Sequence, residues 1–245
     1  MAQLEVVLVP GEIRPRELRG RFVVVIDVLR AGTSVAVALA NGARKVIPVA
    51  GVRSARQKAA ALGRSNVLLC GERSGVRLPG FDLGNSPREY TPERVAGRNL
   101  VFTSSNATRA LARTREAKEV VLAGLVNVSR VAQSAASSDL EITLVCAGRL
   151  GRFGLEDFLA AGLLVKAIRQ ILALTDDDLD DASRMAANFA AEQREDPLGV
   201  LAASTHGRYL CSIGFEADLP LCAALNTVDV VPTFNGEALV PGPRG

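Results

Sequence analysis

Three segments of the sequence place polar groups of phosphate-binding type directly after an apolar run and before a helical pattern. The first begins at Asp27 and continues through Arg30 to Ser34, the second covers 103–109, and the third covers 146–157. A helix start offers free backbone N–H groups and the positive end of the helix dipole, which together bind anions. In open α/β sheets, ligands also lie beyond the carboxyl ends of strands. These segments therefore predict a phosphate site, although the same side chains also serve as ordinary helix caps.

The side chains at these junctions suit a bound oxyanion. Asp27 ends the first apolar run, and Arg30 follows it with a planar guanidinium group. Such a group makes paired hydrogen bonds to phosphate, carboxylate or sulfonate. Hydroxyl and amide groups in the first helical turns would hold the remaining oxygens. These candidate substrate-binding groups are Thr33, Ser34, Ser104, Ser105, Asn106 and Thr108.

A fourth segment, residues 70–87, is too rich in glycine and proline for regular structure, yet it carries several charges. Among them are Glu72, Arg73 and Asp82. Long loops of this composition often carry function, although a solvated surface loop has the same composition. We expect Glu72 to join Asp27 as a principal acidic group, and Arg73 to bind the substrate anion.

An alternation of strands and helices must position these residues. Near-continuous apolar runs are typical of strands covered on both faces, and Ala-rich amphipathic stretches are typical of helices packed on a sheet. The pattern predicts an α/β fold, a three-layer α/β/α sandwich with a parallel or mixed sheet. The predicted strands are 4–9, 22–27, 45–49, 66–70, 99–103, 119–123, 141–147 and 228–231. The predicted helices are 33–42, 53–62, 106–115, 127–137, 155–174, 179–194, 197–204 and 216–225.

Composition narrows the class of protein. We expect one unit over residues 1–245, with any subdomain boundary near 120–140. The net charge of +3 is scattered along the chain, which argues against a nucleic-acid or polybasic membrane surface. The four cysteines form no C-x-x-C pair and His206 is the one histidine, so neither a zinc site nor a disulfide framework is expected. The sequence contains no apolar run long enough to span a membrane, and we expect a cytoplasmic protein.

Short motifs follow one another in order along nearly the whole chain. They are D-V-L-R-A-x-T at 27–33, G-E-R-x-G at 71–75, G-F-D-x-G-N-S-P at 80–87, S-S-N-A-T-R-A-L at 104–111, C-A-G at 146–148, L-E-D at 155–157, H-G-R-Y-L at 206–210 and D-L-P-L-C at 218–222. Together they resemble the magnesium-dependent 2-phosphosulfolactate phosphatases.

This resemblance implies a fold, a cofactor and a reaction. The fold would be an α/β/α sandwich, and the cofactor would be Mg²⁺. The reaction would be hydrolysis of the phosphate ester of a 2-hydroxy acid, with (2R)-2-phospho-3-sulfolactate as substrate and sulfolactate and phosphate as products, on the route to coenzyme M. The expected partner is thus a small anionic phosphorylated 2-hydroxy acid, and formation of a homodimer is left open.

The combined interpretation gives each candidate residue a role. The groups expected to neutralise phosphate charge and orient water are Asp27, Glu72, Arg30 and Arg73. Mg²⁺ commonly takes one or two protein carboxylates together with substrate phosphate. Its ligands are therefore sought among Asp27, Glu72, Asp82 and Asp157. The substrate-binding groups also include Asn85, Ser86 and Cys146.

Other mechanisms compete with metal-assisted hydrolysis. Cys146 and Arg152 have the C-x₅-R spacing of thiolate phosphatases, at a strand end that would lower a thiol pKa. A small buried hydrophobe is the other interpretation of Cys146. Asp27 could form an aspartyl phosphate, but Leu29 stands where such enzymes place a second acid. A non-catalytic anion-binding protein is the last alternative, and His206 is expected to be structural or to lie at the edge of the site.

Overall fold

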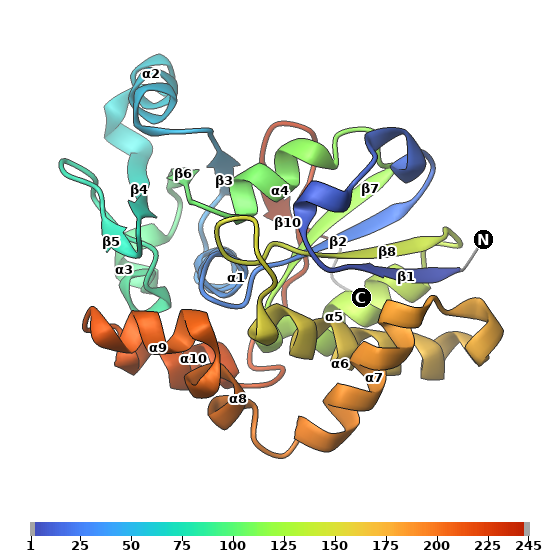
Figure 1. Cartoon of the computed structure of the whole chain (residues 1–245). Coiled ribbons are helices and arrows are strands. Elements are labelled where there is room, and N and C mark those ends of the chain that lie inside the picture. Colours follow the sequence, from blue (N-terminus) through green and yellow to red (C-terminus); the bar gives the residue numbers. More distant parts are fainter. Residues whose placement is uncertain (1–2, 243–245) are drawn as a thin grey trace.

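A ten-stranded mixed β-sheet runs through residues 3–242, the part of the chain that this computed structural model describes (Figure 1). Its strand order is β1-β8-β2-β7-β9-β10-β3-β6-β4-β5. The strands are β1 (Leu4–Val7), β2 (Phe22–Ile26), β3 (Lys45–Pro48), β4 (Val67–Arg73), β5 (Val76–Arg77), β6 (Asn99–Thr103), β7 (Glu119–Ala123), β8 (Ile142–Cys146), β9 (Pro232–Phe234) and β10 (Leu239–Pro241).

The sheet consists of two parallel groups of strands. β1, β8, β2 and β7 are parallel to one another, as are β3, β6 and β4. The antiparallel hairpin β9–β10 lies between the groups and pairs with β7 on one side and β3 on the other. Three successive antiparallel pairings reverse the second group relative to the first. Twist of roughly 20–25° between neighbouring strands also accumulates across the sheet, and β4 runs across the direction of β1 and β8 in Figure 1.

Helices cover both faces of the first group of strands. Alternate side chains of β2 enter different cores: Val24 packs with residues of α5 and α6, whereas Val23 packs with residues of α1 and α4. This is the reason for the uninterrupted apolar sequence of β2. The helices are α1 (Ala31–Ala40), α2 (Val52–Leu62), α3 (Pro92–Val95), α4 (Ala107–Arg113), α5 (Val128–Ala136), α6 (Leu155–Leu172), α7 (Asp181–Gln193), α8 (Pro197–Ala203), α9 (Thr205–Ser212) and α10 (Leu219–Ala223).

The α/β prediction with a mixed sheet is confirmed, and several individual elements differ from the prediction. Residues 228–231 form no strand, because Val228 donates its N–H to the carbonyl oxygen of Val126 (2.9 Å), which lies in a short 3-10 helix and not in a strand. The strand β5, the hairpin β9–β10 and the helices α3 and α9 were not predicted. Their segments are short, and α9 follows α8 after the single residue Ser204. The expectation of one unit over 1–245 stays a prediction.

The carboxyl ends of β2, β4 and β6 meet despite the reversal of direction. Asp27 follows β2 and accepts a hydrogen bond from the Ala107 N–H (3.1 Å), at the start of the helix that follows β6. Glu72, in β4, accepts a hydrogen bond from the Ser105 N–H (2.7 Å), between β6 and α4. The two parallel groups therefore point their carboxyl ends at one region, as ligand sites of α/β sheets require.

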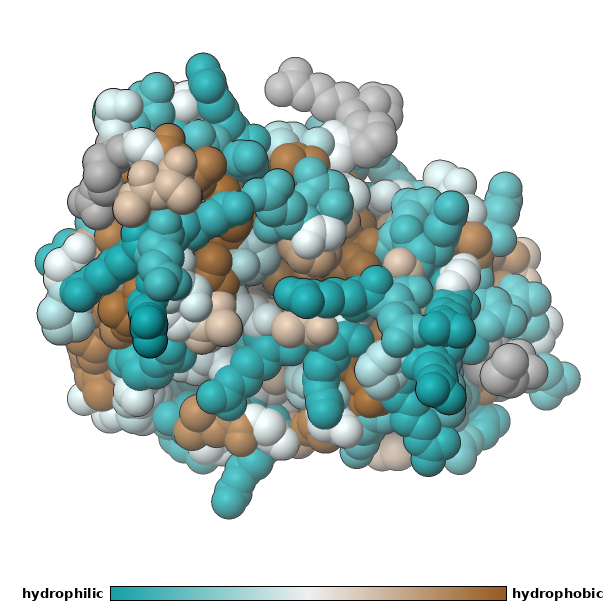
Figure 2. All heavy atoms as spheres, turned by 90° about the horizontal axis from the view of Figure 1, so that it is seen from above, coloured by the Kyte–Doolittle hydropathy of each residue, from teal (hydrophilic) through white to brown (hydrophobic). Residues whose placement is uncertain are grey.

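Hydrophilic side chains cover much of the molecular face seen in Figure 2, with hydrophobic atoms exposed between them, as is usual for protein surfaces. Within residues 3–242, none of the helices combines the length and the apolar character needed to cross a bilayer.

Contact between α6 and α7 depends on Gly162. A Cβ atom at this position would lie 2.0 Å from the Ala186 carbonyl oxygen and 2.7 Å from the Ala190 Cβ. We expect Gly162→Ala to push α7 away and to lower the free energy of unfolding by about 1–3 kcal/mol, despite the better helix propensity of alanine. Urea denaturation measures this change. Gln170→Ala, on the exposed face of the same helix, should change stability by no more than about 0.5 kcal/mol. A stabilising Gly162→Ala would show that the two helices are farther apart.

Candidate active site

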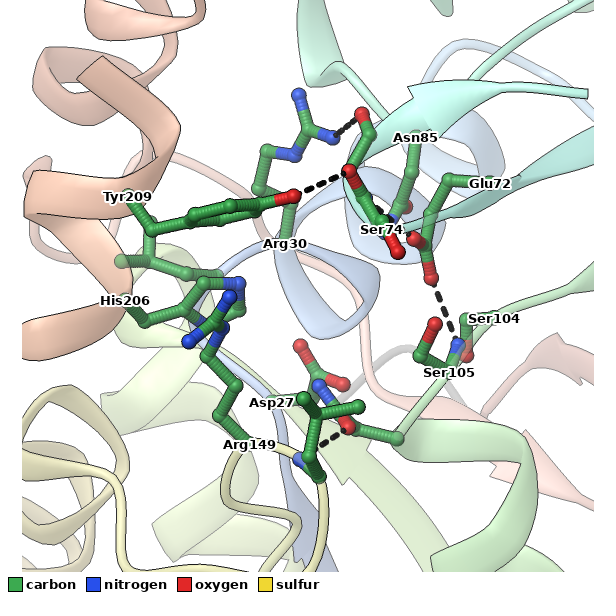
Figure 3. A pocket seen from close by; sticks show the side chains of 14 residues that line it. Asp27, Arg30, Glu72, Ser74, Asn85, Ser104, Ser105, Arg149, His206 and Tyr209 are labelled. Carbon is green, nitrogen blue, oxygen red and sulfur yellow. Dashed lines mark hydrogen bonds between the residues drawn. The ribbon is translucent and has the colours of Figure 1, made fainter. Parts of the chain in front are cut away.

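A pocket opens where the strand ends meet, and residues from both halves of the chain line it (Figure 3). Glu72, Ser104 and Ser105 lie on one side, whereas Arg149, His206 and Tyr209 lie on the other. The lining residues are Asp27, Leu29, Arg30, Glu72, Ser74, Gly75, Asn85, Ser104, Ser105, Asn106, Arg149, Leu150, His206 and Tyr209.

Asp27 connects the starts of two helices at the bottom of the pocket. One carboxylate oxygen accepts the Ala31 N–H (3.0 Å) at the start of α1, and the other accepts the Ala107 N–H (3.1 Å) at the start of α4. Burial raises the pKa of Asp27 to about 6, and the negative charges of Glu72 and Glu156 act in the same direction, against lowering by the charge of His206 and by the Ala31 N–H. Asp27 is therefore protonated more readily than an exposed aspartate, mainly because it is buried.

Glu72 ties the β4–β5 turn to the loop after β6. Its Oε2 accepts the Gly75 N–H and its Oε1 accepts the Ser105 N–H, both at 2.7 Å. The side chain is 6% exposed, so these two hydrogen bonds fix a nearly buried carboxylate at the pocket wall. The sequence-based expectation that Asp27 and Glu72 lie in one pocket agrees with this arrangement.

Arg30 lines the pocket, but its charge is already compensated within the protein. Its guanidinium group makes an ion pair with Asp218 (2.6 Å), and both side chains are 2% exposed. It also donates to the Gly75 carbonyl oxygen and stacks over the Phe215 ring, 4.2 Å from the centroid. Arg30 therefore joins β4–β5 to the C-terminal segment, and its positive charge is already balanced by Asp218.

The other side of the pocket comes from Arg149 and Tyr209, which the sequence did not single out, and from His206, which was expected to be structural or to lie at the edge of the site. Arg149 stacks over the Tyr209 ring at 4.1 Å, and the Tyr209 hydroxyl donates to the Ser74 carbonyl oxygen (3.0 Å). His206 places Nδ1 3.1 Å from Glu156 Oε1. The available signal was the third junction, which contains Arg149, and the H-G-R-Y-L motif, which contains both other residues.

The predicted hydroxyl and amide groups fall into two sets. Ser104, Ser105, Asn106 and Asn85 line the pocket, and Asn106 also accepts the Leu150 N–H through Oδ1 (3.0 Å). The second set lies outside the pocket lining, and backbone carbonyl or carboxylate oxygens of the protein accept its hydroxyl protons. Its members are Thr33, which donates to Val28 O, Ser34, which donates to Asn85 O, Thr108, which donates to Ser104 O, and Ser86, which donates to Asp218 Oδ1.

Two of the predicted charged residues, Arg73 and Asp82, lie outside the pocket lining. Arg73 neighbours Glu72 in a strand, where successive side chains point to opposite faces, so it is exposed and its guanidinium lies near Gly51. Asp82 accepts the Leu69 N–H (2.7 Å) and thereby fastens the 78–87 loop to β4. The structure therefore does not bring either side chain to the site.

Asp157 and Cys146 are buried below the pocket. Asp157 accepts the N–H groups of Val28 (2.9 Å) and Gly148 (2.8 Å), and burial together with the charge of Glu156 raises its pKa well above the usual range. Cys146 has no exposed surface, and burial raises its pKa well above that of an ordinary thiol. The expectation that the strand end would lower this pKa is wrong, because the thiol lies in the core and not at the helix start.

The residues of the pocket fit Mg²⁺ as a ligand set. Asp27 and Glu72 offer carboxylate oxygens, and the buried Oδ1 of Asn85 has no hydrogen-bond partner within the described range. Hard oxygen donors of this kind are those that Mg²⁺ prefers. No group of three or more His, Cys, Asp or Glu side chains in residues 3–242 could hold a metal by itself. Mg²⁺ sites commonly contain only one or two carboxylates and are completed by water and substrate phosphate.

Comparisons with known proteins agree with this geometry. The family model of 2-phosphosulpholactate phosphatase matches residues 7–237. A probable 2-phosphosulfolactate phosphatase of Caldanaerobacter subterraneus subsp. tengcongensis is 40% identical over 223 residues, which cover 91% of each chain. A relative of the same name from Thermotoga petrophila is 40% identical, and the match covers 87% of this chain and 89% of the relative. A relative of the same name from a Synechococcus species is 41% identical, and the match covers 92% of this chain and 93% of the relative. The chain belongs to the 2-phosphosulpholactate phosphatase family, whose name denotes phosphoric monoester hydrolases.

Proposed function

We propose that this chain is a Mg²⁺-dependent phosphatase that hydrolyses (2R)-2-phospho-3-sulfolactate to sulfolactate and inorganic phosphate. The observation that supports this most is the convergence of Asp27 and Glu72, from separate strands, on one pocket with free oxygen acceptors and cationic side chains. Acidic groups around an anion are unfavourable unless a cation lies among them. The names of the relatives indicate the same substrate.

In this proposal the phosphate lies at the loop that follows β6. Ser104 and Ser105 line the pocket there, and their hydroxyl groups would donate to phosphate oxygens. Asp27 and Glu72 would hold Mg²⁺, with Asn85 Oδ1 as a further oxygen donor. The bound ion would neutralise phosphate charge as a Lewis acid. Both carboxylates are fixed by backbone N–H groups, so the site is organised before substrate binds.

His206 would supply the proton that the leaving oxygen needs. Water would attack phosphorus and pass its proton to a phosphate oxygen, while the bond from phosphorus to the C2 oxygen breaks. That oxygen would take a proton from His206 to become the sulfolactate hydroxyl, and His206 would regain a proton from solvent. Glu156 is 1% exposed and orients the imidazole through Nδ1, which leaves Nε2 without a hydrogen-bond partner among residues 3–242. Because His206 lines the pocket, Nε2 is the nitrogen available to the substrate.

The geometry disfavours the cysteine mechanism. Cys146 is absent from the pocket lining, and a thiol with a raised pKa supplies little thiolate at neutral pH. Arg152, the other member of the C-x₅-R pattern, is an exposed residue that does not line the pocket either. Metal-assisted hydrolysis therefore remains the better-supported mechanism.

The first prediction concerns the metal-binding carboxylate. Asp27→Asn should lower kcat/KM for 2-phosphosulfolactate by on the order of 100-fold or more, because it removes a negative ligand. Phosphate release, measured with and without Mg²⁺, reports the change. Chelation of divalent ions should abolish wild-type activity, and Mg²⁺ should restore it.

The matched control is Asp82→Asn, the same change on a carboxylate outside the pocket. Its amide oxygen can still accept the Leu69 N–H, so activity should stay within about twofold of wild type. Activity that survives chelation and is lost in Cys146→Ser would establish the thiolate mechanism instead. Tight binding of 2-phosphosulfolactate without phosphate release would establish a binding protein.

The second prediction concerns pH. The raised pKa of Asp27, about 6, means that the carboxylate is fully charged only above about pH 7. Mg²⁺ binding requires the charged form, so affinity should be constant above pH 7 and fall about tenfold per unit below pH 6. Isothermal titration calorimetry of wild type between pH 5 and 8 measures this. Affinity that changes only below pH 4, the range of an ordinary aspartate, would contradict it.

The third prediction concerns His206. His206→Gln should lower kcat for 2-phosphosulfolactate by about 100-fold, because the alkoxide leaving group needs a proton. An aryl phosphate with an acidic leaving group needs no proton, so hydrolysis of that substrate should change by only a few fold. An equal loss for both substrates would assign His206 a structural role.

A further inference from the structure

The basic side chains of the pocket differ in whether an acidic side chain of the protein is paired with them. Arg30 is paired with Asp218, and His206 is paired with Glu156. Arg149 has no acidic partner and no side-chain hydrogen bond among residues 3–242, and it is half-buried at the pocket wall. Its guanidinium donors are therefore the ones that remain available to a bound anion.

Arg149 is held in place without using those donors. The Cζ atom of Arg149 lies over the Tyr209 ring, 4.1 Å from its centroid, and this cation–π contact uses none of the hydrogen-bond donors of the guanidinium group. The Tyr209 hydroxyl is in turn fixed by the Ser74 carbonyl oxygen. Restricting the side chain in this way lowers the entropy lost when an anion binds.

The backbone around Arg149 is equally restrained. Gly148 has φ +60°, and a Cβ atom there would lie 2.1 Å from the Arg152 carbonyl oxygen, so only glycine allows this tight turn. The Arg149 N–H donates to the same carbonyl (2.9 Å), and Asn106 accepts the Leu150 N–H. The loop thus presents Arg149 to the pocket from a fixed position.

We propose that Arg149 binds the sulfonate of the substrate and thereby makes the site selective for phosphate esters that carry a second strong acid. This inference rests on the proposed function. Arg149 lies across the pocket from Glu72 and Ser105, where the phosphate and its metal ion are placed (Figure 3). A guanidinium fork matches the planar spacing of two anionic oxygens, and its weak hydration suits a weakly basic anion such as a sulfonate.

The test compares two substrates that differ only in the sulfonate. 2-Phosphosulfolactate carries phosphate, carboxylate and sulfonate, whereas 2-phospholactate lacks the sulfonate. Arg149→Gln should lower kcat/KM for 2-phosphosulfolactate by about 10- to 100-fold, mostly through KM, and should change kcat/KM for 2-phospholactate by less than about threefold. Arg149→Lys keeps the charge but loses the fork, so it should recover only part of the selectivity.

Binding of products provides a second readout that needs no turnover. Calorimetric affinity for sulfolactate should fall by the same factor in Arg149→Gln, whereas affinity for lactate should not change. The matched control is Arg152→Gln, which removes the same charge from the same loop at an exposed position outside the pocket. This variant should behave as wild type with both substrates and both products.

Equal losses with both substrates would overturn the inference, because Arg149 would then act on the phosphate or the carboxylate. Unchanged kinetics and unchanged product affinity in Arg149→Gln would overturn it as well. The proposed function fails separately, if wild type releases no phosphate from 2-phosphosulfolactate. Sulfolactate affinity that depends on Arg149 in such a protein would leave the sulfonate site established and the phosphatase activity refuted.

Discussion

The site depends on the two hydrogen bonds that the buried carboxylate of Asp27 accepts from backbone N–H groups. These are the first N–H groups of α1 and α4, so one side chain fixes the starts of two helices that follow different parallel groups of strands. Unsatisfied N–H groups at a helix start are costly when buried, and a carboxylate complements the helix dipole there. Burial raises the pKa of Asp27 to about 6, so the cost of removing this carboxylate from water exceeds what the hydrogen bond from Ala31 and the charge of His206 return.

A second constraint is that Arg30 is paired with an acidic side chain, whereas Arg149 is not paired with one in the part of the chain that the structure describes. Arg30 and Asp218 form an ion pair with almost no exposure, and such pairs compensate desolvation only when both partners are well hydrogen-bonded. The additional hydrogen bonds from Arg30 to Gly75 and from Ser86 to Asp218 meet that requirement. Arg30 thereby secures the C-terminal helices over the pocket, and Arg149 is left with free donors.

The C-terminal helix α9 closes one side of the pocket and determines which side chains line it there. α9 contributes His206 and Tyr209, and Tyr209 crosses the pocket mouth to reach Ser74 in the β4–β5 turn. The segments at the ends of β2, β4 and β6 supply the carboxylates and hydroxyls, whereas Arg149, from the loop after β8, and His206, from α9, line the opposite side. Opposed acidic and cationic walls suit a substrate with several negative charges together with a divalent ion.

The sequence by itself determined the α/β class, seven of the eight predicted strands, and the segments that hold Asp27, Glu72 and Ser104. The spacing of apolar residues and the polar residues that follow a strand are local features of the sequence, so they can be recognised without knowledge of the fold. Tertiary structure decided which polar groups face the pocket. Arg73 is turned away by the strand period, and the raised pKa of Cys146 follows from burial.

Tertiary structure also decided the roles of the arginines. Arg30 and Arg149 have the same side chain, and each follows a strand at the edge of the pocket. Their difference arises from Asp218, which lies 188 positions after Arg30 in the chain. Whether a charge is neutralised depends on neighbours brought together by the fold, and no local pattern in the sequence records them.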